Sequence, residues 1–412
     1  NFSLRPTPAN SRENIAIGQK INHKLMLAIP LSDSELRIGA DQSNTQHTAT
    51  IYNPNMSAFE IENFNNAERN ITGAFAEWTL GASTWDLELG ARINRVAMDS
   101  DNVSAFMGAG MMTTMATVLA TNFNNSNASK TYNNRDLVLK YSNRLSKDVS
   151  LSLSLSSKER APSYQERYLW LPLQSTGGLA DGYTYIGNLD LKSETSNEVS
   201  VSIDYNFANA YLSLNVFYRD VDNFIQGTSY VNTGVATIDT AVAAFANMMS
   251  GGNPALQYNN VDAKLYGGEI NYGSQLSDTI AVNGSLSYVR GKRTDVSDDL
   301  YRLSPLNHLL SLDYNKNDLI LSLISEISAA QNNVSEFNSE QKTSGYSLFH
   351  IKALFAVSDQ LTLRAGIDNL TDKRYQDHLS GYNRVSGNED INQGERLFGT
   401  GRSLSVGASY SF

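Results

Sequence analysis

The sequence of 412 residues contains no cysteine, and this absence fits a compartment in which free thiols are hazardous. It also lacks any run of about eighteen apolar residues, which excludes a transmembrane helix. Residues 1–30 do not show the basic, apolar and small-residue order of a signal peptide. We therefore expect the chain to begin either in the cytoplasm or partway through a processed precursor.

Basic residues are fewer than acidic ones, and common catalytic motifs are absent. Lys and Arg together number 32 against 42 Asp and Glu, and the formal net charge is −10. A nucleic-acid partner would require a clustered basic excess, so we expect none. The motifs G-x-S-x-G, H-E-x-x-H, G-x-G-x-x-G and the P-loop do not occur. We therefore expect neither an enzyme nor a protein that carries a cofactor.

What the sequence does contain is a two-residue alternation of apolar and polar side chains. In DVSLSLSLSS (148–157) leucine and serine alternate, so one face of the segment is apolar and the other is hydroxylic. The same period runs through residues 84–94, 197–207, 360–368 and 402–412. This pattern predicts strands of about ten residues or more.

The connections between the strands alternate in length. Short turns are expected near 30–35, 80–84, 143–149, 206–210, 275–279, 314–318 and 357–360. Long polar or glycine-rich loops are expected between them, near 43–66, 96–131, 158–191, 222–260, 291–303, 329–345 and 370–400. All the tight turns would therefore lie at one end of a sheet and all the long loops at the other.

These features predict an all-β fold, a transmembrane antiparallel β-barrel with an apolar outside that meets lipid and a polar lumen. A soluble β-sandwich also buries one face of each sheet, but it rarely combines strands this long with such asymmetric ends. Aromatic side chains near the strand ends suit an interfacial girdle, namely Trp78, Trp85, Tyr205, Phe207, Tyr288, Tyr410 and Phe412.

Counting the alternating runs gives about fifteen strands, near 14–30, 34–42, 67–80, 84–97, 131–143, 148–158, 192–207, 210–225, 260–275, 279–292, 303–316, 318–329, 344–357, 360–369 and 400–412. Bacterial single-chain barrels have even strand counts, and an unpaired edge cannot remain in lipid. We therefore expect residues 1–412 to form a single domain, the later part of a larger barrel. A sixteenth strand within residues 1–11 is the alternative, although that segment contains two prolines.

Three segments resemble the TonB-dependent outer-membrane receptors. AGIDNLTDKRYQD (365–377), ahead of a last strand ending in Phe412, is similar to the closing hairpin of that family. SSKERAPSYQERY (156–168) and GNLDLKSETSNEVSVSIDY (187–205) resemble two more of its segments in the same order, although Ser193 stands where proline is usual. The resemblance implies a barrel of about 22 strands, of which these would be the last ones, with an N-terminal plug and first strands absent from this sequence. It also implies a bacterial outer-membrane location, with membrane lipid and the TonB complex as partners.

A narrower resemblance is to the copper-receptor branch of this family. It rests on NFSLRP (1–6), QERYLWLPLQSTGGLADGYTYIGN (165–188) and HLSGYNRVSGNEDINQGERLFGTGRS (378–403). It implies copper as the transported ion, with the main metal ligands upstream of residue 1. A receptor for a siderophore or another metal complex is the alternative within the family. A passive porin is the alternative of another class, and an outer-membrane hydrolase is a third for which the histidines give no support.

FMGAGMMTTM (106–115), inside the loop expected at 96–131, carries four of the nine methionines, Met107, Met111, Met112 and Met115. Thioethers are soft ligands that suit Cu(I), so these four are candidate metal ligands. Methionine also fills irregular gaps, so a packing segment is the alternative. Met248 and Met249 form a weaker second case. The five histidines show no paired metal spacing, although His47 could join Met56.

Arg160 and Glu166 stand where the resembled family keeps an arginine and a glutamate. The resemblance implies that they could form ion pairs between the barrel wall and the plug. Ordinary solvated charges are the alternative.

Overall fold

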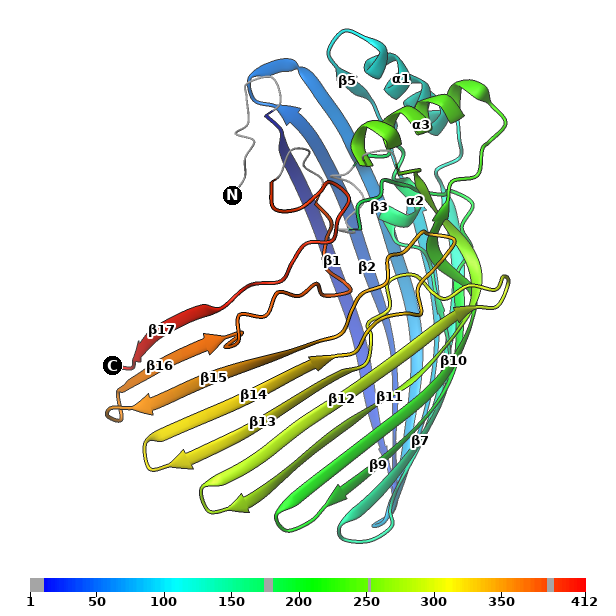
Figure 1. Ribbon diagram of the computed structural model, residues 1–412. Helices are drawn as coiled ribbons and strands as arrows, with labels where there is room; N and C mark the ends of the chain where they lie inside the picture. Colours follow the sequence, from blue (N-terminus) through cyan, green and yellow to red (C-terminus); the bar gives the residue numbers. More distant parts are fainter. Residues whose placement is uncertain (1–10, 174–180, 251–252, 384–388) are drawn as a thin grey trace.

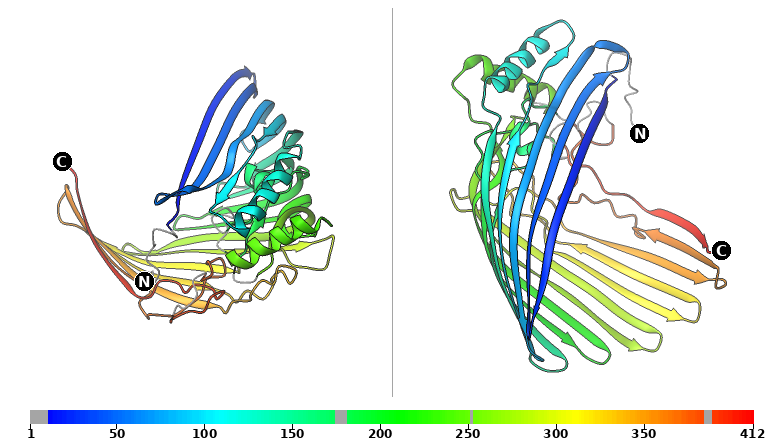
Figure 2. Two further views of the ribbon diagram at one scale, coloured as in Figure 1. Left: turned by 90° about the horizontal axis from the view of Figure 1, so that it is seen from above. Right: turned by 180° about the vertical axis from the view of Figure 1, so that it is seen from behind.

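A computed structural model describes residues 11–173, 181–250, 253–383 and 389–412. One sheet of 17 strands bends into an open, curved wall, with short turns at one end and longer loops and helices at the other (Figures 1 and 2). This arrangement confirms the prediction of a barrel-type sheet with asymmetric ends. The NFSLRP segment and residues 174–180, which contributed to the narrower resemblance, lie outside the described ranges.

In the described ranges, the three helices are too short or too polar to cross a membrane.

Each of the expected strands is present, and two short strands, β5 and β8, were not predicted. The strands are β1 (Glu13–Leu31), β2 (Ser34–Asn53), β3 (Met56–Gly81), β4 (Trp85–Asp99), β5 (Ala105–Met107), β6 (Lys130–Arg144), β7 (Val149–Arg160), β8 (Tyr185–Ile186), β9 (Glu194–Asn206), β10 (Ala210–Ser229), β11 (Leu256–Ser277), β12 (Ile280–Arg293), β13 (Asn307–Lys316), β14 (Leu319–Ser328), β15 (Tyr346–Ala356), β16 (Leu361–Asp368) and β17 (Ser403–Tyr410). The helices are α1 (Met111–Asn124), α2 (Tyr164–Tyr168) and α3 (Ala236–Ser250).

The long strands pair antiparallel with their sequence neighbours, because the short turns bring consecutive strands side by side. β8 is different, since it pairs in parallel with the start of β11. Within the described ranges β1 pairs only with β2 and β17 only with β16, so the sheet is not closed.

The expected long loop at 43–66 is wrong. β2 and β3 continue through it as a hairpin that turns at residues 54–55. Ala49 and Ile51 on one strand and Phe59 and Ile61 on the other are buried at two-residue spacing. The period is therefore present, but the polar residues between these positions concealed it, and the strands extend beyond the main sheet.

Other expected loops contain local structure instead of remaining irregular. Residues 96–131 include β5 and α1, and residues 158–191 include α2 and β8. Residues 222–260 include the end of β10, α3 and the start of β11. The described part of 370–400 forms only an isolated bridge, between Tyr382 and Arg396.

The register separates an apolar row from a polar one. Directly opposed residues form a continuous apolar row across eight strand pairs: Ile29, Leu36, Trp78, Leu89, Leu139, Leu155, Val199, Tyr218 and Tyr266. On the other face polar side chains bond across strands, as Asn215 donates to Ser202 Oγ at 2.7 Å and Ser213 donates to Asp204 at 2.6 Å. The leucine face of residues 148–157 is thus part of a belt that spans several strands.

The main buried apolar cluster lies at the loop end. It joins α1, α3 and the segment after α2 to the outer parts of β2, β3, β4 and β11, and its fully buried side chains include Leu171, Tyr185 and Phe245. Packing among these elements holds the long loops in place, since each helix alone is too short to be stable in water.

Candidate functional site at the loop end of the sheet

The helices α1 and α3 form a helical cap over the loop end of β3, β4, β6 and β11 (Figure 1). The cap is almost free of charge: residues 102–129 contain no Asp, Glu, Lys or Arg, and residues 223–261 contain only Asp239. Asp239 accepts hydrogen bonds from the backbone N of Thr233 at 2.8 Å and the hydroxyl of Tyr230 at 2.9 Å. The groups that the cap can present to a ligand are therefore neutral polar groups, methyl groups and thioethers.

The predicted methionine segment is spread over β5 and the first turn and a half of α1. Met111 is 68% exposed, whereas Met107, Met112 and Met115 are partly buried and pack against the apolar cluster. Met249 of α3 packs against the same cluster. The structure thus gives three of these thioethers packing contacts and leaves one open to solvent, and their role as metal ligands stays a prediction.

Local sequence explains why α1 begins where it does. Gly108 and Gly110 adopt positive φ angles of 90° and 140°, which suit glycine and let the chain turn sharply after β5. Thr113 then accepts a hydrogen bond from the backbone N of Met107 at 3.0 Å and donates one to the carbonyl of Gly108. These contacts fix Met107 and Met111 relative to each other at the rim of the cap.

Arg160 and Glu166, which were expected to contact a plug, are bonded to one another. The Arg160 guanidinium donates to both oxygens of Glu166 at 2.9 and 3.1 Å and, through Nε, to Glu194 at 2.6 Å. Glu166 also accepts a hydrogen bond from the backbone N of Ser163 in a capping box that begins α2. The pair therefore joins the end of β7, the start of α2 and the start of β9. Contact of Arg160 and Glu166 with a plug stays a prediction.

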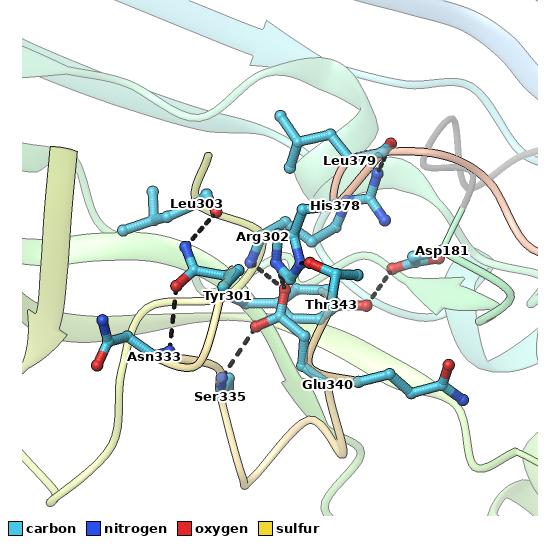
Figure 3. A network of polar contacts seen from close by, with 12 residues as sticks. Asp181, Tyr301, Arg302, Leu303, Asn333, Ser335, Glu340, Thr343, His378 and Leu379 are labelled. Atoms are coloured by element: carbon cyan, nitrogen blue, oxygen red, sulfur yellow. Dashed lines mark hydrogen bonds and ion pairs between the residues drawn. The ribbon is translucent and has the colours of Figure 1, made fainter. Parts of the chain in front are cut away.

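A buried carboxylate joins three other loops, as Figure 3 shows. Glu340, between β14 and β15, accepts hydrogen bonds from the backbone N of Arg302 at 2.9 Å and of Ser335 at 2.9 Å. His378, between β16 and β17, lies 3.1 Å from the same carboxylate, and the side chains of His378 and Glu340 are 1% and 2% exposed. The other ring nitrogen of His378 lies 3.0 Å from the Thr343 hydroxyl.

Asp181 bonds two tyrosines beside this network, and Figure 3 shows its contact with Tyr301. It accepts hydrogen bonds from the hydroxyls of Tyr301, at 2.9 Å, and Tyr185. Burial raises the pKa of Tyr301, and the negative charge of Asp181 raises it further. Tyr301 therefore stays a neutral donor. No sequence motif indicated these contacts, because Tyr301 lies 120 residues from Asp181 and Tyr185, four residues from it, belongs to no known spacing motif.

The histidines lie apart from one another, each with different neighbouring residues. His47 lies against Phe64 and Tyr164, with ring centroids 5.6 and 4.6 Å apart. His350 Nδ1 is 3.0 Å from Asp368, and His308 Nε2 is 2.9 Å from the Tyr272 hydroxyl. Among the described residues no group of three or more His, Asp or Glu side chains could hold a metal ion.

The sequence matches a known protein family over most of its length. The family model described as "TonB dependent receptor-like, beta-barrel" matches residues 7–370. No curated protein matches the sequence.

Among solved structures, the copper transporter OprC superposes with a TM-score of 0.77 at 20% identity over 100% of this chain and 60% of its own. The ferric yersiniabactin uptake receptor FyuA from Yersinia pestis gives 0.66 at 11% identity, over 97% of this chain and 55% of its own. The ferric citrate transporter FecA gives 0.67 at 13% identity over 97% and 55%. The chain thus spans little more than half of these structures, and identities this low indicate a shared fold alone.

Proposed function

This chain belongs to the TonB-dependent receptor β-barrel family, and from that premise we propose that it forms barrel wall and outer loops of a receptor that takes up a scarce metal, with copper as the cargo. The family consists of transporters and receptors of the bacterial outer membrane. The apolar row from Ile29 to Tyr266 would meet the hydrocarbon of that membrane, and the opposite, hydrogen-bonded face would line the lumen. Coupling to the TonB complex is proposed from family membership.

The proposal that copper is the cargo rests on the thioether groups of the cap. A soft ion such as Cu(I) is bound by thioethers, which need no deprotonation. Met111 is exposed at the start of α1, Met112 and Met115 follow within about one turn, and Met107 ends β5 just before the helix. The surrounding residues 102–129 contain no charged group that would attract a hard cation instead. Binding of one ion by several sulfurs would require α1 to rearrange, because Met107, Met112 and Met115 pack against the apolar cluster.

A ferric siderophore is the alternative cargo. A site for such a complex would be expected to present aromatic and cationic side chains to solvent. Tyr168 and Trp170, two aromatic residues near the loop end, are instead buried in the apolar cluster. This burial favours the metal ion over a bulky complex. A passive porin, the alternative of another class, would conduct small solutes without TonB.

The test is a Cu(I) titration of the receptor purified in detergent, against a competing chelator of known affinity. We expect replacement of Met107, Met111, Met112 and Met115 by Leu to weaken binding by about tenfold or more, which corresponds to about 1.4 kcal/mol. The matched control replaces Met26 and Met98, which lie on β1 and β4, by Leu and should bind as the unmodified receptor does. Equal copper affinity in the quadruple variant would rule out the cap as the capture site, and copper accumulation that persists in cells without TonB would favour a porin.

A further inference from the structure

Arg167 is a buried cation without a carboxylate partner. It lies in α2 and is 1% exposed. Its guanidinium donates to the hydroxyl of Tyr132 at 2.6 Å and to the carbonyls of Leu189 at 2.7 Å and Ala128 at 2.8 Å. All three acceptors are neutral. Across the described ranges no Asp or Glu lies within ion-pair distance of it, and the residues outside those ranges include no Asp or Glu.

Burial of a cation without an anion is energetically unfavourable. A charge removed from water is normally stabilised by an opposite charge, and a buried cation without one destabilises the fold. Arg160, seven residues earlier, has two carboxylates although its side chain is 45% exposed. Arg167 also keeps one donor, Nε, without any hydrogen-bond partner. Neutral oxygens and the rings of Tyr132 and Tyr168, whose centroids lie 5.7 and 5.2 Å from the guanidinium carbon, therefore satisfy part of this side chain. Within the described ranges no negative charge balances it, and one N–H group has no acceptor.

Arg167 lines a cavity of about 190 Å³ between α1, the segment after α2 and α3. Its walls combine apolar side chains such as Phe123 and Ile186 with the amides of Asn122, Asn188 and Gln257. No acidic side chain lines it. A cavity of about 150 Å³ can bind a molecule the size of benzene, so this one has room for a small organic molecule.

We propose that this cavity binds a small organic monocarboxylate, whose anionic head meets Arg167 and whose apolar part lies against Phe123 and Ile186. The carboxylate supplies the charge that Arg167 lacks and can accept the bond that its Nε does not make. The apolar walls favour an organic acid over an inorganic anion, which would leave them without contacts. Since α1 and α3 both line the cavity, the ligand would also fasten the helical cap to the α2 segment. This site is independent of the cargo proposed above.

The experiment uses benzoate as the probe and the thermal unfolding midpoint of the detergent-purified receptor as the readout, with calorimetry for affinity. We expect benzoate to raise the midpoint of the unmodified receptor in a saturable way. Asn122→Trp places a large side chain at the mouth of the cavity from an exposed position on α1, so it should fold normally and weaken benzoate binding by about tenfold or more. Arg167→Met should abolish the benzoate effect.

Arg396→Met is the matched control. Arg396 is a second buried arginine, it donates to neutral oxygens including the carbonyl of Ser380, and it is outside this cavity. Its loss should lower the midpoint but leave the benzoate increment intact. The proposal is overturned if benzoate has no saturable effect, if it acts equally on Asn122→Trp and the unmodified receptor, or if inorganic phosphate or chloride binds and benzoate does not. Copper binding need not change in any of these variants.

Discussion

Leu155 of β7 lies directly opposite Leu139 of β6, while Ser154, one residue earlier, lies opposite Lys140 on the other face of the sheet. Side chains alternate between the faces of a strand, so a step of one residue moves a substitution from the apolar belt to the polar face. Leu155 and Ser154 therefore form a matched pair for testing which face meets lipid.

Leu155→Arg should destabilise the receptor in a bilayer by about 2 to 4 kcal/mol, the cost of placing an arginine on the lipid face near mid-membrane. Ser154→Arg introduces the same side chain on the polar face and should cost less than about 1 kcal/mol. The measurement is equilibrium unfolding by denaturant of receptor refolded into phosphocholine vesicles. Equal losses in the two variants would contradict the assignment of the faces.

Arg160→Gln should destabilise the junction of β7, α2 and β9 by about 1 to 3 kcal/mol, because it leaves two carboxylates without their cation. The side chains of Glu166 and Glu194 are 15% and 12% exposed, so water compensates them only partly. Solvent screening of Arg160 itself places the value toward the lower end of that range.

The control for this junction is Arg37→Gln. Arg37 bonds Glu35 and Glu77, whose side chains are more exposed, and its loss should cost less than about 0.5 kcal/mol. Thermal unfolding and protease cleavage within residues 161–193 measure both variants. If the double variant Arg160→Gln, Glu194→Gln were no more stable than Arg160→Gln, an unpaired carboxylate would not be the cause.

Glu340→Ala should loosen three loops together. It removes the acceptor of two backbone N–H groups and of His378 in a buried setting, for which a local loss of about 3 to 5 kcal/mol is expected. Hydrogen exchange of the amides in 294–306, 329–345 and 369–402 should accelerate in concert. Glu336→Ala, an exposed position in the same loop, is the control and should leave exchange unchanged. Faster exchange confined to 329–345 would show that Glu340 does not link the three loops.

Acidification should release the start of α3. Desolvation acts to raise the pKa of Asp239, but hydrogen bonds from Thr233, Tyr230 and Gly234 outweigh it and hold the pKa below its usual range. A depressed pKa in the folded state stabilises the fold above the unfolded value of about 4, and this stabilisation is lost as pH falls through the lower folded value.

Amides at the start of α3 should therefore exchange faster below about pH 4, after correction for the intrinsic rate. Asp239→Asn has no carboxylate to titrate, so its corrected exchange should not change with pH in this range. An identical acid-dependent step in both proteins would assign the effect to another group.

The sequence by itself determined the fold class, the two faces and most strand positions. The reason is that a period of two is a local property: Leu151, Leu153 and Leu155 define an apolar face without reference to any other part of the chain. Tight turns between such segments leave antiparallel neighbours as the only short connection, so pairing followed as well. The methionine segment could also be recognised from the sequence, because its four methionines lie within nine residues. Arg160 and Glu166 were singled out by resemblance, and only the structure shows that they bond to each other.

Only the tertiary structure revealed the conformation and contacts of the segments at the loop end of the sheet. The β2–β3 hairpin runs through a segment expected to be a loop, because burial of Ile51 and Ile61 outweighs its polar composition. The contacts of Glu340 with Arg302 and His378 join residues 38 positions apart on either side. Such contacts depend on how loops pack once the sheet has brought their ends together, and no local period encodes them. The burial of Arg167 has the same origin, since its surroundings come from several separate segments that fold over one another.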